Sequence, residues 1–195
     1  LPIKDIVVHD IDYIVGIDDA DRISNPSYEV YFEDGSVEYL SSGMSFMCGS
    51  QWLWVSGESY DGELVAGQTL TLTAKLGKFE KTYKVNAIEN PIASIEIHDV
   101  EIVEGVNAWL DESDNYRYNL DNLDATVYYK DGTSEKITNY CTIGNTEYYI
   151  NNNSDEVQEN GTYWVLGGEY TVTGSLLGCT DTFKVKIVPL PIQKL

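Results

Sequence analysis

The stretch IKDIVVHDIDYIVG, residues 3–16, decides the fold, because the chain repeats it as IASIEIHDVEIVEG at residues 92–105. The two copies align without gaps, share a His-Asp dipeptide and both end on glycine. Three further blocks repeat in the same order: VYFEDG as VYYKDG, GQTLTLTAKLG as GEYTVTGSLLG, and YKV as FKV. Agreement in order and residue type indicates two homologous domains, and such a repeat determines the architecture.

We predict a first domain over residues 1–89 and a second over residues 90–189. The last segment, LPIQKL at residues 190–195, resembles the opening LPIKDI, so we expect it to be the start of a third repeat or a linker. In the third repeated block, this alignment places Gly67 on Gly168. A chain that opens on LPIKDI without methionine is expected to be a segment of something longer.

The pattern inside each copy is typical of β-structure. Apolar and polar residues alternate around Asp-Gly in YEVYFEDGSVEYL and ATVYYKDGTSEKI, which predicts a hairpin with a two-residue type I′ turn in each copy. The closing segments TYKVNAI and TFKVKIV are expected to pair back across a Leu-Gly turn. About seven short strands per copy, with no long helical period, predict an all-β fold of two tandem immunoglobulin-like β-sandwich domains.

These residues resemble the bacterial immunoglobulin-like domains of group 3. The resemblance rests on the Ile-rich first strand, the VYYKDGTSEKIT block and the closing FKVKIV strand, and it covers both copies. It implies a non-catalytic module of a secreted or wall-attached bacterial protein, with neighbouring modules, a glycan, or a host or cell-wall protein as partners. The acidic connectors 16–27 and 107–124 and the aromatic segment 46–63 depart from the family pattern.

The charge of the chain excludes two classes of partner. Its 12 Lys and Arg residues oppose 32 Asp and Glu residues, for a net charge of −20. The resulting field repels nucleic acid and anionic lipid, so we expect neither as a partner. No apolar run approaches the roughly 20 residues that span a bilayer, so no membrane insertion is expected. The resemblance instead implies an extracellular or cell-wall location.

No catalytic site is expected, and the protein is predicted not to be an enzyme. The segment GESYD at residues 57–61 has Asp where a nucleophile elbow needs its second Gly. His9 and His98 open equivalent His-Asp dipeptides. A feature that occurs in both copies is explained better by a structural role in the fold than by a catalytic site. There is no cluster of His with Cys that would predict zinc.

No cofactor is expected, with calcium as the alternative. The segment DESDNYRYNLDN at residues 111–122 fails as an EF-hand loop, because Tyr116 stands where Gly is required and Asn122 where Glu is required. A looser set of oxygen ligands could come from the acidic connectors, although solvated acidic loops explain the same residues. The candidate calcium ligands are Asp18, Asp19, Asp21, Asp121 and Asp124.

The three cysteines allow at most one internal bridge. The two copies share no cysteine, so a disulfide is not a feature of the repeat. Cys141 with Cys179 is the best candidate pair, and Cys48 is left over.

The aromatic residues suggest a second function. Trp52 and Trp54 are two positions apart, so in a strand both rings would lie on one face. Exposed rings would stack on sugar rings, and Tyr148, Tyr149 and Trp164 would form a similar patch in the second copy; the alternative is that the rings pack in a core or at the interface between domains. We therefore predict a module that spaces, presents or adheres, with a carbohydrate-binding module as the alternative.

Overall fold

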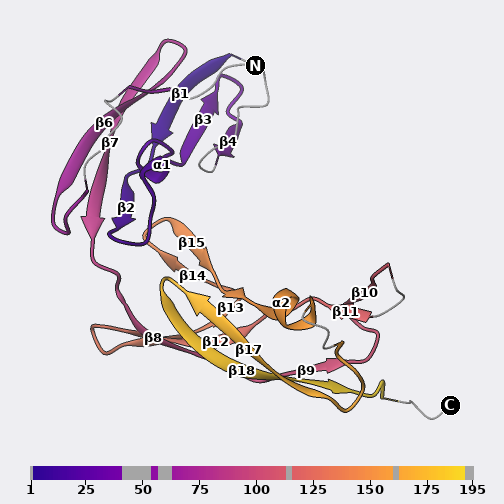
Figure 1. Cartoon of the computed structure of the whole chain (residues 1–195). Helices are drawn as coiled ribbons and strands as arrows, with labels where there is room; N and C mark the ends of the chain where they lie inside the picture. Colours follow the sequence, from indigo (N-terminus) through magenta and orange to yellow (C-terminus); the bar gives the residue numbers. More distant parts are fainter. Residues whose placement is uncertain (1, 41–53, 57–62, 113–115, 160–162, 192–195) are drawn as a thin grey trace. The chain divides into compact units, whose positions relative to one another are not determined.

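The computed structural model describes residues 2–40, 54–56, 63–112, 116–159 and 163–191. The chain divides into two compact units, Leu1–Asn90 and Pro91–Leu195, which are called unit 1 and unit 2 below (Figure 1). Both units consist mainly of β-strands, which confirms the predicted all-β fold. The units are described separately.

The described residues of unit 1 form two sheets and one short helix. One sheet has the strand order β1-β3-β4 and the other has the order β2-β7-β6-β5. The elements are β1 (Ile3–Val8), β2 (Ile11–Ile14), α1 (Ala20–Ile23), β3 (Tyr28–Phe32), β4 (Val37–Leu40), β5 (Trp54–Ser56), β6 (Thr69–Leu76) and β7 (Phe79–Ile88).

Unit 2 repeats this plan with additions. Its two main sheets have the orders β13-β12-β8 and β16-β17-β18-β9, and two separate hairpins, β10-β11 and β14-β15, accompany them (Figure 1). The elements are β8 (Ile92–Ile97), β9 (Val100–Val103), β10 (Ala108–Leu110), β11 (Tyr116–Tyr118), β12 (Asp124–Tyr129), β13 (Ser134–Thr138), β14 (Tyr140–Ile143), β15 (Thr146–Tyr149), β16 (Asn151–Asn152), α2 (Ser154–Glu159), β17 (Glu169–Leu176) and β18 (Cys179–Val188).

The His-Asp dipeptides stand where the first strand of each unit changes sheets. In unit 1, β1 pairs antiparallel with β3, and after the dipeptide β2 pairs parallel with β7. In unit 2, β8 and β9 pair in the same two ways with β12 and β18. The Asp10 carboxylate accepts a hydrogen bond from the Lys84 N–H at 2.7 Å, and Asp99 accepts one from the Lys184 N–H at 2.8 Å. The aspartate thus fastens the crossover to the last strand in both units.

Alternating apolar residues of the two sheets form a core in each unit. In unit 1, Leu76 of β6 joins the buried residues of β1, β3 and β4, so side chains of both sheets meet. A second cluster surrounds Tyr83, whose hydroxyl donates to the Ile23 carbonyl at 2.7 Å and thereby holds α1. In unit 2 the counterparts Leu176 and Phe183 are both 1% exposed.

The Asp-Gly hairpins form, but the predicted type I′ turn is wrong. Gly132 has φ of 88°, and Asp131 is not among the residues with positive φ. The Tyr129 N–H bonds to the Thr133 carbonyl at 2.9 Å, so three residues form the loop. This is the pattern of a type I turn followed by a glycine bulge, which also accepts the sequence Asp-Gly. Unit 1 has the same turn at Asp34-Gly35, with Gly35 at 88°.

The aspartate of this turn makes unit 2 sensitive to acid. Hydrogen bonds from the Thr133 hydroxyl and N–H lower the pKa of Asp131 below its ordinary 3.8. A lowered folded-state pKa gives stability that is complete above the unfolded pKa and is lost as pH falls through the folded pKa. We expect Asp131→Asn to reduce the free energy of unfolding at neutral pH, and the difference from wild type to shrink below pH 3.8. Urea unfolding across this range measures it, and a constant difference would contradict the assignment.

The structure corrects one part of the sequence alignment. Strands Thr69–Leu76 and Glu169–Leu176 have the same length and are 100 positions apart, as are β7 and β18. The N–H of Gly67 bonds to the Ala87 carbonyl, and the N–H of Gly167 bonds to the Ile187 carbonyl. Gly67 therefore corresponds to Gly167 rather than to Gly168, and the predicted alignment was wrong by one residue there.

With this alignment, one pair of facing core residues differs in size between the two units. Gly174 in unit 2 corresponds to the fully buried Ala74 in unit 1, and Ile97 corresponds to Val8. A Cβ at position 174 would overlap with the Cδ1 atom of Ile97. The smaller residue on one strand thus makes room for the larger one on the facing sheet.

A double-mutant cycle tests this exchange. We expect Gly174→Ala alone to destabilise unit 2 by about 1–2 kcal/mol through overpacking. Ile97→Val alone should cost about 0.5–1.5 kcal/mol. The double variant reproduces the pair found in unit 1, so it should be more stable than additivity predicts by about 1 kcal/mol. Additive effects in chemical denaturation would show that the two positions do not share space.

Candidate functional site

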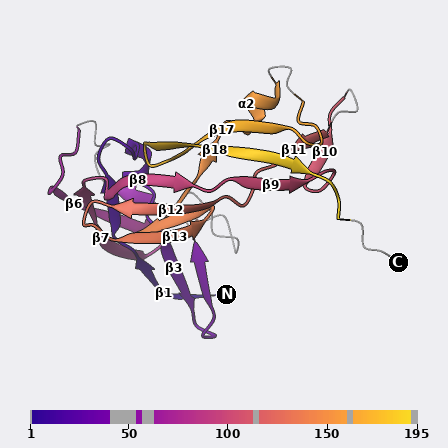
Figure 2. The same cartoon turned by 90° about the horizontal axis from the view of Figure 1, so that it is seen from below.

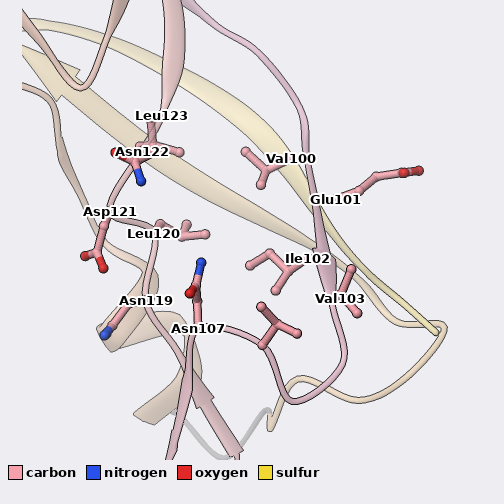
Figure 3. A pocket seen from close by; sticks show the side chains of 11 residues that line it. Val100, Glu101, Ile102, Val103, Asn107, Asn119, Leu120, Asp121, Asn122 and Leu123 are labelled. Carbon is pink, nitrogen blue, oxygen red and sulfur yellow. The ribbon is translucent and has the colours of Figure 1, made fainter. Parts of the chain in front are cut away.

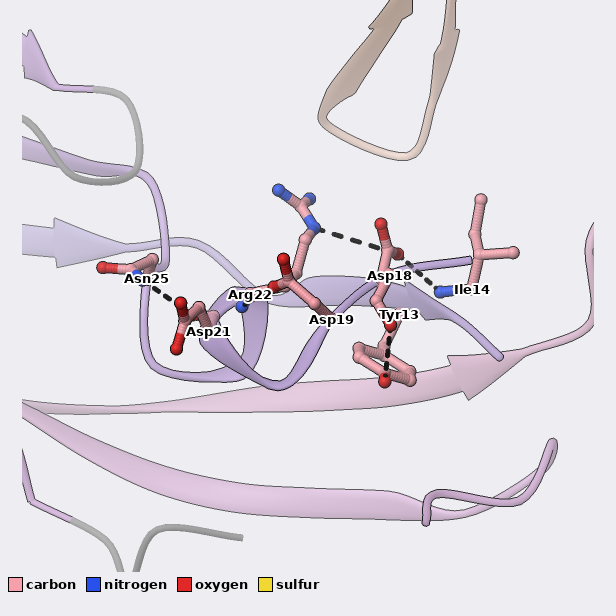
Figure 4. A network of polar contacts seen from close by, with 7 residues as sticks. All are labelled: Tyr13, Ile14, Asp18, Asp19, Asp21, Arg22 and Asn25. Atoms are coloured by element: carbon pink, nitrogen blue, oxygen red, sulfur yellow. Dashed lines mark hydrogen bonds and ion pairs between the residues drawn. The ribbon is translucent and has the colours of Figure 1, made fainter. Parts of the chain in front are cut away.

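The three aspartates proposed for calcium in unit 1 are engaged in local structure (Figure 4). Asp18 accepts a hydrogen bond from the Ile14 N–H at 2.7 Å and lies 4.0 Å from the Arg22 Nε atom. Asp19 is the N-cap of α1 and accepts from the Arg22 N–H at 3.2 Å. Asp21 is exposed, and its main-chain carbonyl accepts from Asn25 at 2.6 Å. The carboxylates do not converge on one point.

The two candidates in unit 2 are also separate. Asp121 is exposed, and Asp124 accepts a hydrogen bond from the Thr138 hydroxyl at 2.6 Å. In the part of the chain that the structure describes, no three His, Cys, Asp or Glu side chains are placed to hold a metal ion. Calcium binding therefore stays a prediction, and the described residues supply no set of ligands for it.

The candidate bridge between Cys141 and Cys179 does not form, because both cysteines are free. Cys141 is buried on β14, whereas Cys179 begins β18 with its Sγ atom 3.8 Å from the Ala93 carbonyl oxygen. Burial raises the pKa of the Cys141 thiol to about 11, which disfavours the thiolate that disulfide exchange requires. Cys48 lies outside the described residues.

The expected aromatic patch of unit 2 does not form as predicted. Trp164 is only 2% exposed, so the prediction of an exposed ring is wrong. It stacks between Tyr118, with ring centroids 6.2 Å apart, and Tyr170, at 5.2 Å. Its counterpart in unit 1 is Leu64, which is 4% exposed, so this position belongs to the core in both units.

Tyr148 and Tyr149 cannot act together, because adjacent residues of a strand point to opposite faces. Tyr149 is 50% exposed and pairs across the hairpin with Tyr140, at a ring distance of 5.3 Å. Tyr148 lies opposite the buried Cys141 instead. Trp52 lies outside the described residues, and Trp54 begins β5.

An exposed tryptophan that the sequence analysis missed lies on the β10-β11 hairpin. Trp109 of β10 is 52% exposed and lies opposite Arg117 of β11. In both views of the chain, this hairpin lies beside α2 at one end of unit 2 (Figures 1 and 2). In the chain, the hairpin stands where unit 1 has α1. The segment from Gly16 to Tyr28 in unit 1 spans 12 positions, whereas the equivalent segment from Gly105 to Ala125 in unit 2 spans 20.

The Arg117 side chain is held on two sides. Its Nε atom lies 3.5 Å from an Asp111 carboxylate oxygen, and its guanidinium lies over the Tyr163 ring at 5.4 Å. An ion pair combined with a cation–π contact fixes the orientation of the guanidinium. The hairpin therefore carries a positioned cation beside an exposed indole ring.

Gln158 of α2 anchors the hairpin to the body of unit 2. Its side-chain amide accepts a hydrogen bond from the Tyr118 N–H at 2.8 Å and donates to the Tyr118 carbonyl at 3.1 Å. Gln158 is 1% exposed and also donates to the Ser154 carbonyl. The amide thus pairs with Tyr118 as a neighbouring strand would, and it satisfies both main-chain groups of a buried residue.

A pocket of about 220 Å³ opens at the base of the hairpin (Figure 3). Its apolar wall includes Val100 and Ile102 of β9 and Leu120. Asn107 and Asn122 extend their amide groups toward this wall, whereas Glu101 points away from it (Figure 3). Asn107 has φ of 52° and its carbonyl accepts from the Asn119 N–H at 3.1 Å, so the base of the hairpin is closed.

Comparison with known proteins gives no family for this chain. No protein-family model matches it, and no curated protein matches it. Among solved structures, it is similar to domains 4–9 of surface layer protein SbsC, with 16% identity and a TM-score of 0.28 over 96% of this chain. Domains 5–6 of the S-layer protein SbsC match 97% of the chain with 16% identity and a TM-score of 0.24.

The chain spans 31% of the length of the first of these structures and covers 99% of the second. These TM-scores are too low for the likeness to indicate a function. Among the described residues, no helix is long and apolar enough to cross a membrane.

Proposed function

We propose that the chain is a non-catalytic module that spaces and presents neighbouring modules of a secreted or wall-attached bacterial protein. The observation that carries the proposal is the identical use of polar residues in both units. Asp10 and Asp99 fasten the crossover, and Asp34 and Asp131 close the hairpin turn. Residues repeated in this way serve the fold rather than a reaction.

In each unit, the strand that follows the His-Asp dipeptide and the last strand are suited to transmitting tension. In unit 1, β2 pairs parallel with β7, with Ile11 opposite Val85 and Ile14 opposite Ile88. Tension on the two ends of the unit pulls these parallel strands in opposite directions along their length. All hydrogen bonds between them are then loaded at once, and in unit 2 the strands β9 and β18 repeat the arrangement.

The joint between the units is short. Glu89, Asn90 and Pro91 are the residues between β7 and β8. Pro91 fixes its own φ, and its carbonyl accepts a hydrogen bond from the Lys130 N–H at 2.9 Å. The Pro2 carbonyl accepts the equivalent hydrogen bond from the Glu33 N–H at 3.0 Å. A short joint anchored in this way supports a spacer better than a long flexible linker would.

A matched pair of core substitutions tests whether each unit is self-contained. Val85 and Val185 are equivalent and fully buried. We expect Val85→Ala to destabilise unit 1 alone and Val185→Ala unit 2 alone, each by about 2 kcal/mol from lost burial and the remaining cavity. Hydrogen exchange read by mass spectrometry assigns the change to a unit. Loss of protection in both units from either substitution would contradict independent modules.

A further inference from the structure

We propose that the β10-β11 hairpin and the pocket at its base bind a neutral glycan, with Trp109 as the stacking surface. This inference goes beyond the spacer function and does not depend on it. The site belongs to unit 2, because unit 1 has α1 in place of the hairpin.

Two exposed aromatic rings lie beside Arg117. Trp109 is 52% exposed and lies opposite Arg117, whose guanidinium lies over the ring of Tyr163, a residue that is 40% exposed. Leu110 and Tyr116, which are 54% and 46% exposed, belong to the other face of the hairpin, because neighbouring residues of a strand point in opposite directions. Grouped apolar side chains at a surface mark a place of contact rather than a packing requirement. The flat face of an indole ring is suited to the apolar C–H face of a sugar ring, while the hydroxyls of the sugar remain free for polar groups.

Polar groups line the pocket at the base of the hairpin. Asn107 and Asn122 extend their amides toward its apolar wall, whereas the amide of Asn119 points away from that wall (Figure 3). A carboxamide both donates and accepts hydrogen bonds, as a sugar hydroxyl does, so the two amides match neighbouring hydroxyls. Arg117 adds a guanidinium fixed between Asp111 and Tyr163, and its remaining N–H groups are donors.

The size of the pocket limits what it can hold. The pocket volume of about 220 Å³ is below the ~300–1,000 Å³ of sites for drug-sized ligands. It suits one ring of an oligosaccharide, with adjacent rings extending across the hairpin. The apolar wall of Val100, Ile102 and Leu120 provides a surface for the C–H face of that ring.

The charge around the pocket selects the class of glycan. Glu101 and Asp121 are among the residues around the pocket, with the Glu101 side chain pointing away from its apolar wall, and Glu104, Asp111 and Glu112 lie on the adjoining segments. Asp111 balances the charge of Arg117, so the other carboxylates leave the surroundings acidic. Uronic acids, phosphorylated glycans and nucleic acids would be repelled. Glycans without charged groups meet no such barrier.

The test titrates the complete chain with three uncharged probes, cellohexaose, chitohexaose and mannohexaose, and with hexagalacturonate as an anionic control. Binding is followed by calorimetry and tryptophan fluorescence. We expect saturable binding of at least one uncharged probe and none of hexagalacturonate. Trp109→Ala should weaken that binding at least tenfold, and Asn107→Ala about fivefold.

Tyr39→Ala is the matched control, because Tyr39 is a 74% exposed aromatic residue on a strand of unit 1 and its loss should leave binding unchanged. Unchanged hydrogen exchange around the buried Trp164 verifies that each variant of unit 2 is folded. The proposal is overturned if none of the three uncharged probes binds, if the folded Trp109→Ala variant binds as wild type does, or if hexagalacturonate binds more tightly than the uncharged probes.

Discussion

Replacement of Trp164 by alanine is expected to destabilise unit 2 by about 3–5 kcal/mol, the usual cost of removing a buried tryptophan. The ring is 2% exposed and stacks between Tyr118 and Tyr170. Tyr170 in turn accepts a hydrogen bond from the Val165 N–H at 2.9 Å and donates to the Tyr163 carbonyl at 3.2 Å. The loss would therefore loosen the segment before β17 as well. Urea unfolding with hydrogen exchange measures it.

Trp164→Phe is the control for this prediction. The Nε1 atom of Trp164 is buried and has no hydrogen-bond partner among the described residues. Phenylalanine keeps an aromatic ring in the stack and removes this unsatisfied donor, whose burial is itself costly. We expect Trp164→Phe to cost less than half as much as Trp164→Ala. Equal costs would mean that aromatic stacking does not stabilise this part of unit 2.

Replacement of Gln158 by methionine is expected to destabilise unit 2 by about 2–4 kcal/mol. Methionine has a similar volume, but it leaves the buried N–H and carbonyl of Tyr118 without their partner, and each such group costs about 1–3 kcal/mol. The hairpin should also lose protection against hydrogen exchange, because Gln158 connects it to α2. Exchange at Tyr118 is the direct measurement.

Glu156→Ala on the same helix is the control for Gln158. Glu156 is exposed, so its replacement should change the free energy of unfolding by no more than about 0.5 kcal/mol. If Gln158→Met behaved like Glu156→Ala, water would be replacing the lost amide, and Tyr118 would not be buried as the structure places it.

The fold could be predicted from the sequence because its determinants are local or repeated. The alternating residues around Asp-Gly specify a hairpin wherever they occur, and the repeated His-Asp dipeptide marks the change of sheet in both units. The turn type was not decided by the sequence, since Asp-Gly suits both a type I′ turn and a type I turn with a glycine bulge.

The environment of Trp164 was predicted wrongly because the tryptophan was not matched with its counterpart in the first copy. The alignment of the neighbouring block, Gly67 on Gly168, was shifted by one residue, and extending it would place Leu64 on Val165 instead of on the core residue Trp164. Tyr148 and Tyr149 failed as a pair because two adjacent strand residues face opposite ways.

The hairpin around Trp109 was missed because its partners are distant in sequence. Nothing close to Trp109 indicates that Tyr163 and Gln158, more than 40 positions away, support the hairpin. The available signal was the extra length of unit 2 between Gly105 and Ala125, together with a tryptophan in an otherwise acidic connector.

We propose that the two units are self-contained and transmit tension through their parallel strands, β2 with β7 and β9 with β18. The most direct measurement is to stretch the complete chain by its ends in a force spectrometer. We expect two separate unfolding events, each lengthening the chain by about 30 nm, as follows from roughly 90 residues at ~3.6 Å each. A single event of twice that length, or gradual extension without force peaks, would contradict it.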